Sequence, residues 1–274
     1  MSSKILLNKK IHDKLSQVYD KKHTEIYNEI EQNRLQETLK TIYHLKSDDG
    51  IISVLDFGAG TGNLTLKFLS FGCLVTAGDV SEKSLSVLLQ KTESLYHGKV
   101  NTVVLKNHKI PFPDNHFDIV ATYSVLHHVP DYLFVIQEMM RVTKSKGLIY
   151  IDHEFNDNRW NPSQHLEQYY ERTKQTLFEH IKQLIETREL FTYDFLKTVL
   201  IKLFVNSRYE REGDLHVWKD DHIEWNKILQ LLADKFEIIS NNDYLLYRPK
   251  GGIVLYEKYK NICNDMKYII YKKY

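Results

Sequence analysis

Apolar residues recur along this chain with two alternating spacings. Near the N-terminus, residues 9–46 carry apolar side chains three or four positions apart, such as Leu35 and Leu39, which predicts helices. Short apolar runs that suit buried strands then follow at 51–57, 74–77, 100–105, 117–123 and 147–152. Segments with helical spacing separate several of these runs, as at 81–96 and 131–143. Strands that alternate with helices are typical of a doubly wound α/β fold with a mostly parallel sheet.

The alternation stops after the fifth strand. Residues 160–205 have helical spacing, and a helix near 222–235 then precedes two extended runs, 236–247 and 252–259. A Gly-Gly turn between these last two runs favours a hairpin. The pattern therefore predicts a seven-stranded sheet with a helical insertion after strand five.

Four parts of the chain follow from this reading. We expect an N-terminal helical segment over 1–46 in the active-site cover, a ligand-binding core over 47–155 and 220–260, a helical substrate cap over 156–219 and a solvated C-terminal tail over 261–274.

Composition narrows the classes of function. The 274 residues are 42% hydrophobic and 27% charged, as in an ordinary globular protein, and the formal net charge of +1 provides no global attraction to nucleic acid or an anionic membrane. No apolar run approaches the ~18 residues of a membrane span, and the Ile5–Leu7 run is too short for a signal peptide. We expect a soluble cytoplasmic protein. The sequence leaves a homodimer as a possible assembly.

A glycine-rich turn follows the first predicted strand. Gly58, Ala59, Gly60 and Gly62 come just after Asp56, which stands two positions before the first glycine. Glycines let the backbone turn sharply and let a ligand approach closely. The third glycine comes one position earlier than in the nicotinamide-binding fingerprint. A carboxylate here suits a cofactor with a cationic amino acid end and no phosphate.

A second acid, Asp79, ends the second predicted strand. A carboxylate at this position can accept hydrogen bonds from both hydroxyls of a ribose. Ser81 is the better N-cap for the following helix, so Asp79 is not needed for that purpose.

Three blocks carry a family resemblance. VLDFGAGTG (54–62), IPFPDNHFDIVATYSVLHHV (110–129) and MMRVTKSKGLIYI (139–151) occur in this order. Together they resemble the class I S-adenosylmethionine-dependent methyltransferases, in particular the small-molecule group that includes the ubiquinone/menaquinone biosynthesis enzymes. The resemblance implies a Rossmann-like fold and S-adenosylmethionine as the cofactor, with S-adenosylhomocysteine as its product.

The resemblance also implies roles for further residues. Val80 would pack against adenine, and the backbone of Ser124 would meet the cofactor's amino group. Asn107 and His108 stand near the position where relatives have an aspartate for the adenine amine, and Tyr19 would close over the methionine end. Asp56, Gly58 and Gly60 would line that methionine end, and Ala59 and Gly62 of the same turn would also contact the cofactor.

Candidate catalytic residues follow the fourth and fifth predicted strands. His128 lies in the His127-His128 pair, and His153 and Glu154 end the fifth strand in the triplet Asp152-His153-Glu154. Each side chain could contact the substrate or instead have a structural role. A general base is needed only where the acceptor has a proton that resists removal. No spacing of the histidines, acids and two cysteines matches a known metal-ligand set, so we predict no metal site.

These observations favour a methyltransferase that modifies a small-molecule acceptor, by O- or N-methylation, through in-line transfer of the methyl group. C-methylation of a quinone-like ring remains open, although the long insertion departs from the compact quinone enzymes. The alternatives are a nucleic-acid or protein methyltransferase and a non-catalytic cofactor-binding scaffold. The segment Ser124–His128 lacks the Pro-Pro-aromatic loop of enzymes that methylate DNA amino groups, so we expect no nucleic-acid partner.

Overall fold

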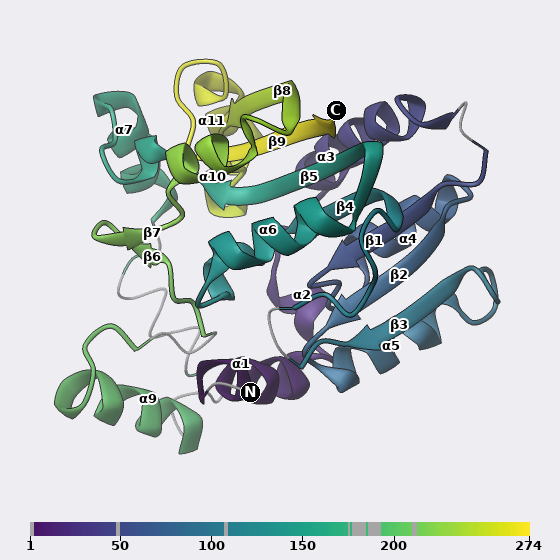
Figure 1. Ribbon diagram of the computed structural model, residues 1–274. Coiled ribbons are helices and arrows are strands. Elements are labelled where there is room, and N and C mark those ends of the chain that lie inside the picture. The colour runs from purple at the N-terminus through teal and green to yellow at the C-terminus, as the bar shows by residue number, and fades with distance from the viewer. Residues whose placement is uncertain are drawn as a thin grey trace.

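A computed structural model describes residues 3–47, 50–106, 109–174, 176, 185, 193–209 and 213–274. Its centre is a seven-stranded sheet with the order β3-β2-β1-β4-β5-β9-β8 (Figure 1). The strands are β1 (Ser53–Phe57), β2 (Leu74–Asp79), β3 (Val100–Val104), β4 (Phe117–Tyr123), β5 (Thr143–Phe155), β8 (Phe236–Tyr244) and β9 (Met266–Lys273). Neighbouring strands are parallel except where β9 pairs with β5 and β8. The predicted doubly wound, seven-stranded fold is confirmed.

Helices pack on both faces of this sheet. The described helices are α1 (Ser3–Leu15), α2 (Tyr19–Lys22), α3 (Glu29–His44), α4 (Asn63–Ser70), α5 (Glu82–Thr92), α6 (Tyr132–Val142), α7 (Gln164–Thr173), α9 (Tyr193–Phe204), α10 (Trp225–Leu232) and α11 (Gly252–Tyr259). Single-turn 3₁₀ helices among the described residues are η2 (Leu126–His128), η3 (Asp157–Arg159) and η5 (Pro249–Gly251). In the part of the chain that the structure describes, no helix is both long and apolar enough to cross a membrane.

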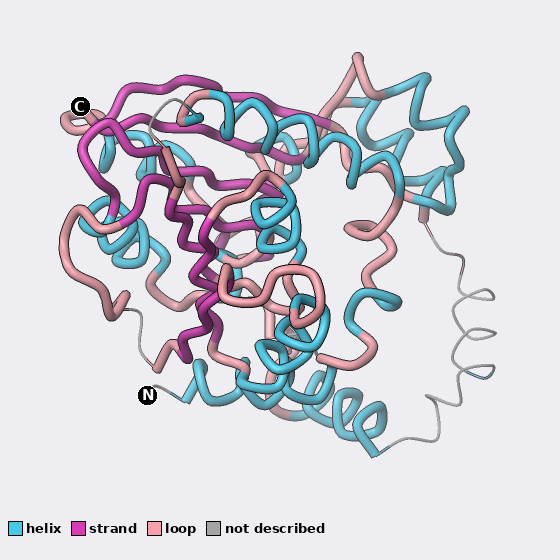
Figure 2. The backbone as a smooth tube through the Cα atoms, turned by 90° about the vertical axis from the view of Figure 1, so that its right-hand side faces the viewer, coloured by secondary structure: helices cyan, strands magenta, loops and turns pink. Residues whose placement is uncertain are grey.

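The strands are apolar on both sides because both faces are covered. On one face, Leu55 and Ile149 pack with α6 and α10, and on the other face, Val54 and Tyr150 pack with α3 and α4. Successive residues of a strand point to opposite faces, so strands buried on both sides appear in the sequence as continuous apolar runs. Figure 2 shows the strands as a layer with helices on either side of it.

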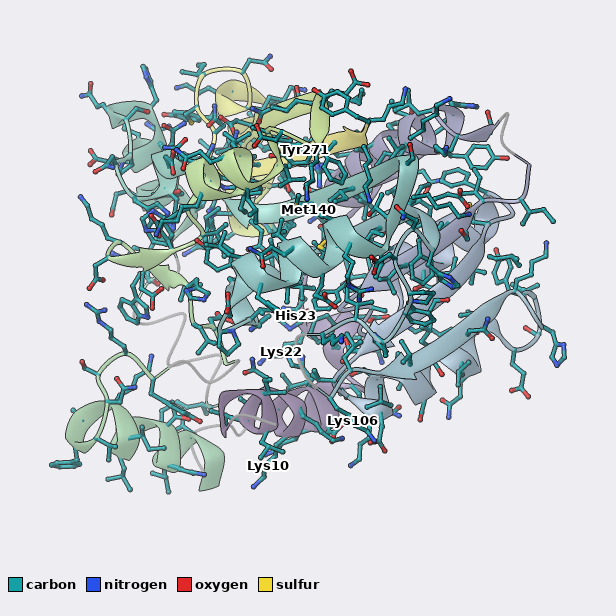
Figure 3. All side chains as sticks on the ribbon, viewed as in Figure 1. Lys10, Lys22, His23, Lys106, Met140 and Tyr271 are labelled. Atoms are coloured by element: carbon teal, nitrogen blue, oxygen red, sulfur yellow. The ribbon has the colours of Figure 1, made fainter. Side chains whose placement is uncertain are left out.

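The C-terminal prediction was wrong in two respects. Residues 252–259 form helix α11 instead of a hairpin strand, and the expected tail 261–274 contains β9, a central strand of the sheet. Ile269, Ile270 and Tyr271 are almost completely buried, and in Figure 3 Tyr271 lies in the interior near Met140 of α6, whereas Lys10 of α1 points outward. The lysines at the ends of this short apolar run made it look like a solvated segment.

Some elements of the predicted insertion gather at one edge of the sheet. Figure 1 shows α1, α7 and α9 on the side toward which β3 and β5 point, together with the short pair β6 (Val217–Trp218) and β7 (Asp221–His222). Leu166 and Tyr169 of α7 form a small apolar cluster with Leu245, Tyr259 and Cys263. Much of the chain between α7 and α9 lies outside the described residues. The division into core and cap stays a prediction.

The central position of β9 predicts a large effect of truncating a side chain there. Ile269→Ala should lower the free energy of unfolding by about 2–5 kcal/mol, because it leaves a cavity in a fully buried layer. Chemical denaturation measures this change. Lys272→Ala, on the same strand but partly exposed, should change it by no more than about 0.5 kcal/mol. Equal, small effects of both substitutions would contradict a central strand at this position.

Candidate active site

One cavity lies at the edge where the parallel strands end. Asp56 comes from β1, Asp79 from the end of β2 and Ser124 from the residue after β4, and all three line it. The carboxyl ends of parallel strands meet at such an edge, where doubly wound folds bind their ligands. Val80, Tyr19 and Ala59, predicted from the sequence as cofactor contacts, line the same cavity.

The glycine-rich turn divides into two parts with different functions. Gly58 and Gly60 line the cavity, and a Cβ on Gly58 would lie 2.4 Å from Cγ2 of Val125, so only glycine fits against the loop after β4. Gly62, predicted as a cofactor contact, instead faces Leu88 of α5, where a Cβ would lie 2.3 Å from Cδ1. Gly62 therefore permits close packing of α4 and α5, and it is not among the described residues that line the cavity.

Asp79 holds the glycine-rich turn as well as facing the cavity. Its Oδ2 accepts a hydrogen bond from the backbone N–H of Gly60 at 2.8 Å, and its Oδ1 accepts one from the N–H of Ser81 at 2.7 Å. Ser81 caps α5 through the N–H of Ser84, as predicted. Asp79 is thus fixed by two backbone donors while its carboxylate borders the cavity.

Both acids are held in an environment that disfavours ionisation. Burial raises the pKa of Asp56 to about 7, the negative charge of Asp79 adds to this rise, and the hydrogen bond from Thr65 Oγ1 opposes it. Burial also raises the pKa of Asp79, while His12 opposes the rise. Among the described residues that line the cavity there is no lysine or arginine. The cavity therefore combines two buried carboxyl groups with no strong cation to neutralise them.

The N-terminal helices form one wall of the cavity. The sequence predicted this segment as a cover but, apart from Tyr19, not the individual residues that line the cavity. Ile5, Asn8 and His12 of α1 line the cavity, as do Ile26 and Tyr27 between α2 and α3. Asp13 and Asp20 attach this wall to the sheet domain: Ser81 Oγ donates to Asp13 at 2.7 Å, and Thr61 Oγ1 donates to Asp20 at 2.6 Å. No local pattern marks these residues, because their position depends on contacts between distant segments.

The loop after β4 brings His128 to the cavity. Glu154 fixes this loop: its Oε1 accepts hydrogen bonds from the N–H groups of Val125 and Leu126 at 3.0 and 2.7 Å, and its Oε2 lies 2.8 Å from Nδ1 of His127. Glu154 is buried and is not among the described cavity-lining residues. Its contacts are those of a residue that positions the loop.

His153 belongs to a buried polar network beneath the cavity. Residues 152–154 lie within β5, which is longer than predicted because its end pairs with β9. The ring Nδ1 of His153 lies 3.0 Å from Oη of Tyr123 and 3.3 Å from Oε1 of Glu31. Arg34 pairs with both Glu31 and Asp152, so the network contains two acids and one guanidinium. Tyr123 lines the cavity, whereas His153 is one side chain removed from it.

Two predicted cofactor contacts cannot be placed. Asn107 and His108 lie outside the described residues. Their neighbour in the sequence, Leu105, lines the cavity next to Val80, on the side of β2 and β3.

Comparisons with known proteins agree with this geometry. Residues 55–151 match the methyltransferase domain family. The chain is 37% identical over 127 residues to an uncharacterized methyltransferase of Schizosaccharomyces pombe, covering 42% of this chain and 44% of that protein. It is 38% identical over 104 residues to the ubiquinone/menaquinone biosynthesis C-methyltransferase UbiE of Shewanella sediminis, covering 36% and 41%.

A solved structure extends the likeness of fold to most of the chain. A SAM-dependent methyltransferase from Methanosarcina mazei superposes with a TM-score of 0.51 at 21% identity, covering 81% of this chain and 92% of that one. These two relatives are matched over less than half of their length. The segment that matches the family, residues 55–151, contains the glycine-rich turn, Asp79 and the loop after β4. Residues 55–151 therefore form the centre of a class I S-adenosylmethionine-dependent methyltransferase domain, similar to that of the ubiquinone/menaquinone C-methyltransferases.

Proposed function

We propose that this protein transfers the methyl group of S-adenosylmethionine to a small-molecule acceptor bound in the same cavity. The observation that carries the proposal is the pair of buried carboxyl groups, Asp56 and Asp79, facing a cavity with no lysine or arginine among its described lining residues. Such a cavity favours a cationic ligand over a pyrophosphate. S-adenosylmethionine has two positive charges, an ammonium and a sulfonium, and no phosphate.

Each part of the cofactor has a suitable partner. Asp56 and the backbone of Ser124 would bind the ammonium, with Tyr19 closing over this end, and Asp79 would accept from the ribose hydroxyls. Val80 would pack against adenine. We propose that Asn107 or His108 binds the amino group of the adenine. Gly58 and Gly60 give the cofactor access to the backbone of the turn.

The remaining wall indicates the kind of acceptor. Ile5, Ile26, Val129 and Pro130 are apolar, and His128 lies beside them. An acceptor with an apolar body and one polar group fits this surface. Methyl transfer from a sulfonium is an in-line displacement, so holding the acceptor atom, the methyl carbon and the sulfur in line supplies much of the catalysis. We propose O- or N-methylation of this acceptor. The name of UbiE gives C-methylation for that relative, and analysis of the methylated product would distinguish the two.

Ligand binding to variants tests the assignment of the two acids. Calorimetry with S-adenosylmethionine and 5′-methylthioadenosine separates them, because the second compound has the ribose and adenine but lacks the amino acid end. Asp56→Asn should weaken S-adenosylmethionine about 10-fold or more and leave methylthioadenosine unchanged. Asp79→Asn should weaken both compounds. Asp114→Asn, which removes an exposed carboxylate elsewhere, serves as the matched control.

The outcomes are distinct. Failure of the wild-type protein to bind either compound would overturn the proposed function. Equal loss of methylthioadenosine binding in Asp56→Asn and Asp79→Asn would contradict the placement of the ammonium at Asp56.

The raised pKa of Asp56 also predicts how stability depends on pH without ligand. Between its usual pKa near 4 and its folded value of about 7, Asp56 keeps a proton in the folded state that it has lost in the unfolded state. As the pH rises through this range, the free energy of unfolding of the wild-type protein therefore falls relative to that of Asp56→Asn. The fall is up to about 1.4 kcal/mol per unit of pH. Urea denaturation of both proteins at pH 5 and pH 8 measures the difference. A stability difference that stays constant with pH would show that Asp56 ionises without cost.

A further inference from the structure

Three potential metal ligands meet beside the cavity. His127 and His128 belong to η2, after β4, and Asp214 comes from the segment that leads into β6. One ligand atom from each residue lies within 4.8 Å of the other two. The chain separates Asp214 from the histidines by most of the insertion, so no spacing in the sequence revealed this group.

His127 is oriented as metal-binding histidines are. Its Nδ1 lies 2.8 Å from Oε2 of Glu154, which is almost fully buried. A carboxylate that accepts from one ring nitrogen fixes the tautomer and leaves the other nitrogen able to bind a metal. That other nitrogen, Nε2, faces Oδ1 of Asp214 at 3.9 Å.

His128 has a buried ring nitrogen without a hydrogen bond. Its Nδ1 lies 3.1 Å from Oδ1 of Asp214, yet it makes no hydrogen bond in the described part of the chain. A close approach of two such atoms without a hydrogen bond between them is compatible with two ligands of one ion.

Backbone contacts hold the two segments together. The N–H groups of Leu215 and His216 both donate to the carbonyl oxygen of His127, at 2.8 and 3.1 Å. Asn8 Nδ2 of α1 donates to the carbonyl oxygen of His128 at 2.7 Å. The ligand-bearing residues are therefore fixed relative to each other independently of any ion.

We propose that His127 Nε2, His128 Nδ1 and Asp214 Oδ1 bind one divalent transition-metal ion at the rim of the cavity. Two imidazoles and one carboxylate suit zinc, manganese, iron or cobalt better than magnesium or calcium, which prefer oxygen ligands. Metal–ligand distances of about 2.0–2.2 Å would require the three side chains to rotate toward one another from separations of up to 4.8 Å. This proposal replaces our sequence prediction that the protein has no metal site.

Three protein ligands leave coordination positions open. His128 lines the cavity at the acceptor end, so one open position would face an acceptor oxygen. A divalent ion lowers the pKa of a bound hydroxyl, which would make it a better methyl acceptor. This role rests on the proposed function, whereas metal binding itself does not.

Cobalt titration of the full-length, chelator-treated protein tests the site. The visible d–d absorption of bound Co²⁺ depends on the ligands around the ion. Displacement of Co²⁺ by added Zn²⁺ then measures the affinity of the site for Zn²⁺. The wild-type protein should bind one ion, and Asp214→Asn and His128→Gln should each weaken binding at least 10-fold. Glu154→Gln should weaken it about 10- to 100-fold through the orientation of His127. His97→Gln, at an exposed histidine far from the cluster in the sequence, should have no effect.

The results separate the metal site from the proposed function. Absence of Co²⁺ binding, or equal affinity in wild type, Asp214→Asn and His128→Gln, would overturn the metal site. S-adenosylmethionine binding is measured on the same samples, so its failure would overturn the proposed function while leaving the cobalt result intact. Asp214 is partly exposed, and an unchanged circular dichroism spectrum of Asp214→Asn shows that loss of metal is not loss of fold.

Discussion

The burial of two carboxyl groups at one edge of the sheet is the constraint around which this site is built. Asp56 and Asp79 come from adjacent strands whose carboxyl ends meet, and removal from water raises the pKa of both. Ionising them without a nearby cation is costly, and the described lining residues include no lysine or arginine. A cationic ligand offsets that cost when it binds. The fold thus keeps an unfavourable arrangement of charge at the position where, in the proposed function, the cationic end of the cofactor binds.

The remainder of the site is held by buried polar contacts that local sequence does not reveal. Glu154 fixes the loop after β4 by accepting hydrogen bonds from two backbone N–H groups and by contacting His127. Arg34 forms ion pairs with Glu31 and Asp152 in the buried polar network that includes His153. These groups act on the cavity by positioning other residues. They explain why buried charged side chains follow the apolar middle part of β5, Leu148–Ile151.

Sequence alone predicted the parts that depend on local pattern. The strands β1 to β5, the helix cap at Ser81 and the cavity-lining positions of Asp56, Gly58 and Asp79 follow from apolar runs, cap chemistry and the glycine-rich turn. Predictions failed where partners distant in the chain decide the outcome. Residues 266–273 look polar at both ends yet insert between β5 and β8, and Gly62 contacts a helix instead of the cavity. Nothing near residue 214 predicts that its carboxylate meets two histidines.

The most direct test of the central claim is the number of protons released when S-adenosylmethionine binds near pH 7. Calorimetry in two buffers of different ionisation enthalpy measures it for the wild-type protein and for Asp56→Asn. If the cofactor's ammonium meets the Asp56 carboxylate, binding lowers the raised pKa of this group, and the wild-type protein releases more protons than the variant. Binding with the same proton release in both proteins would contradict the claim that this buried acid is the cation's partner.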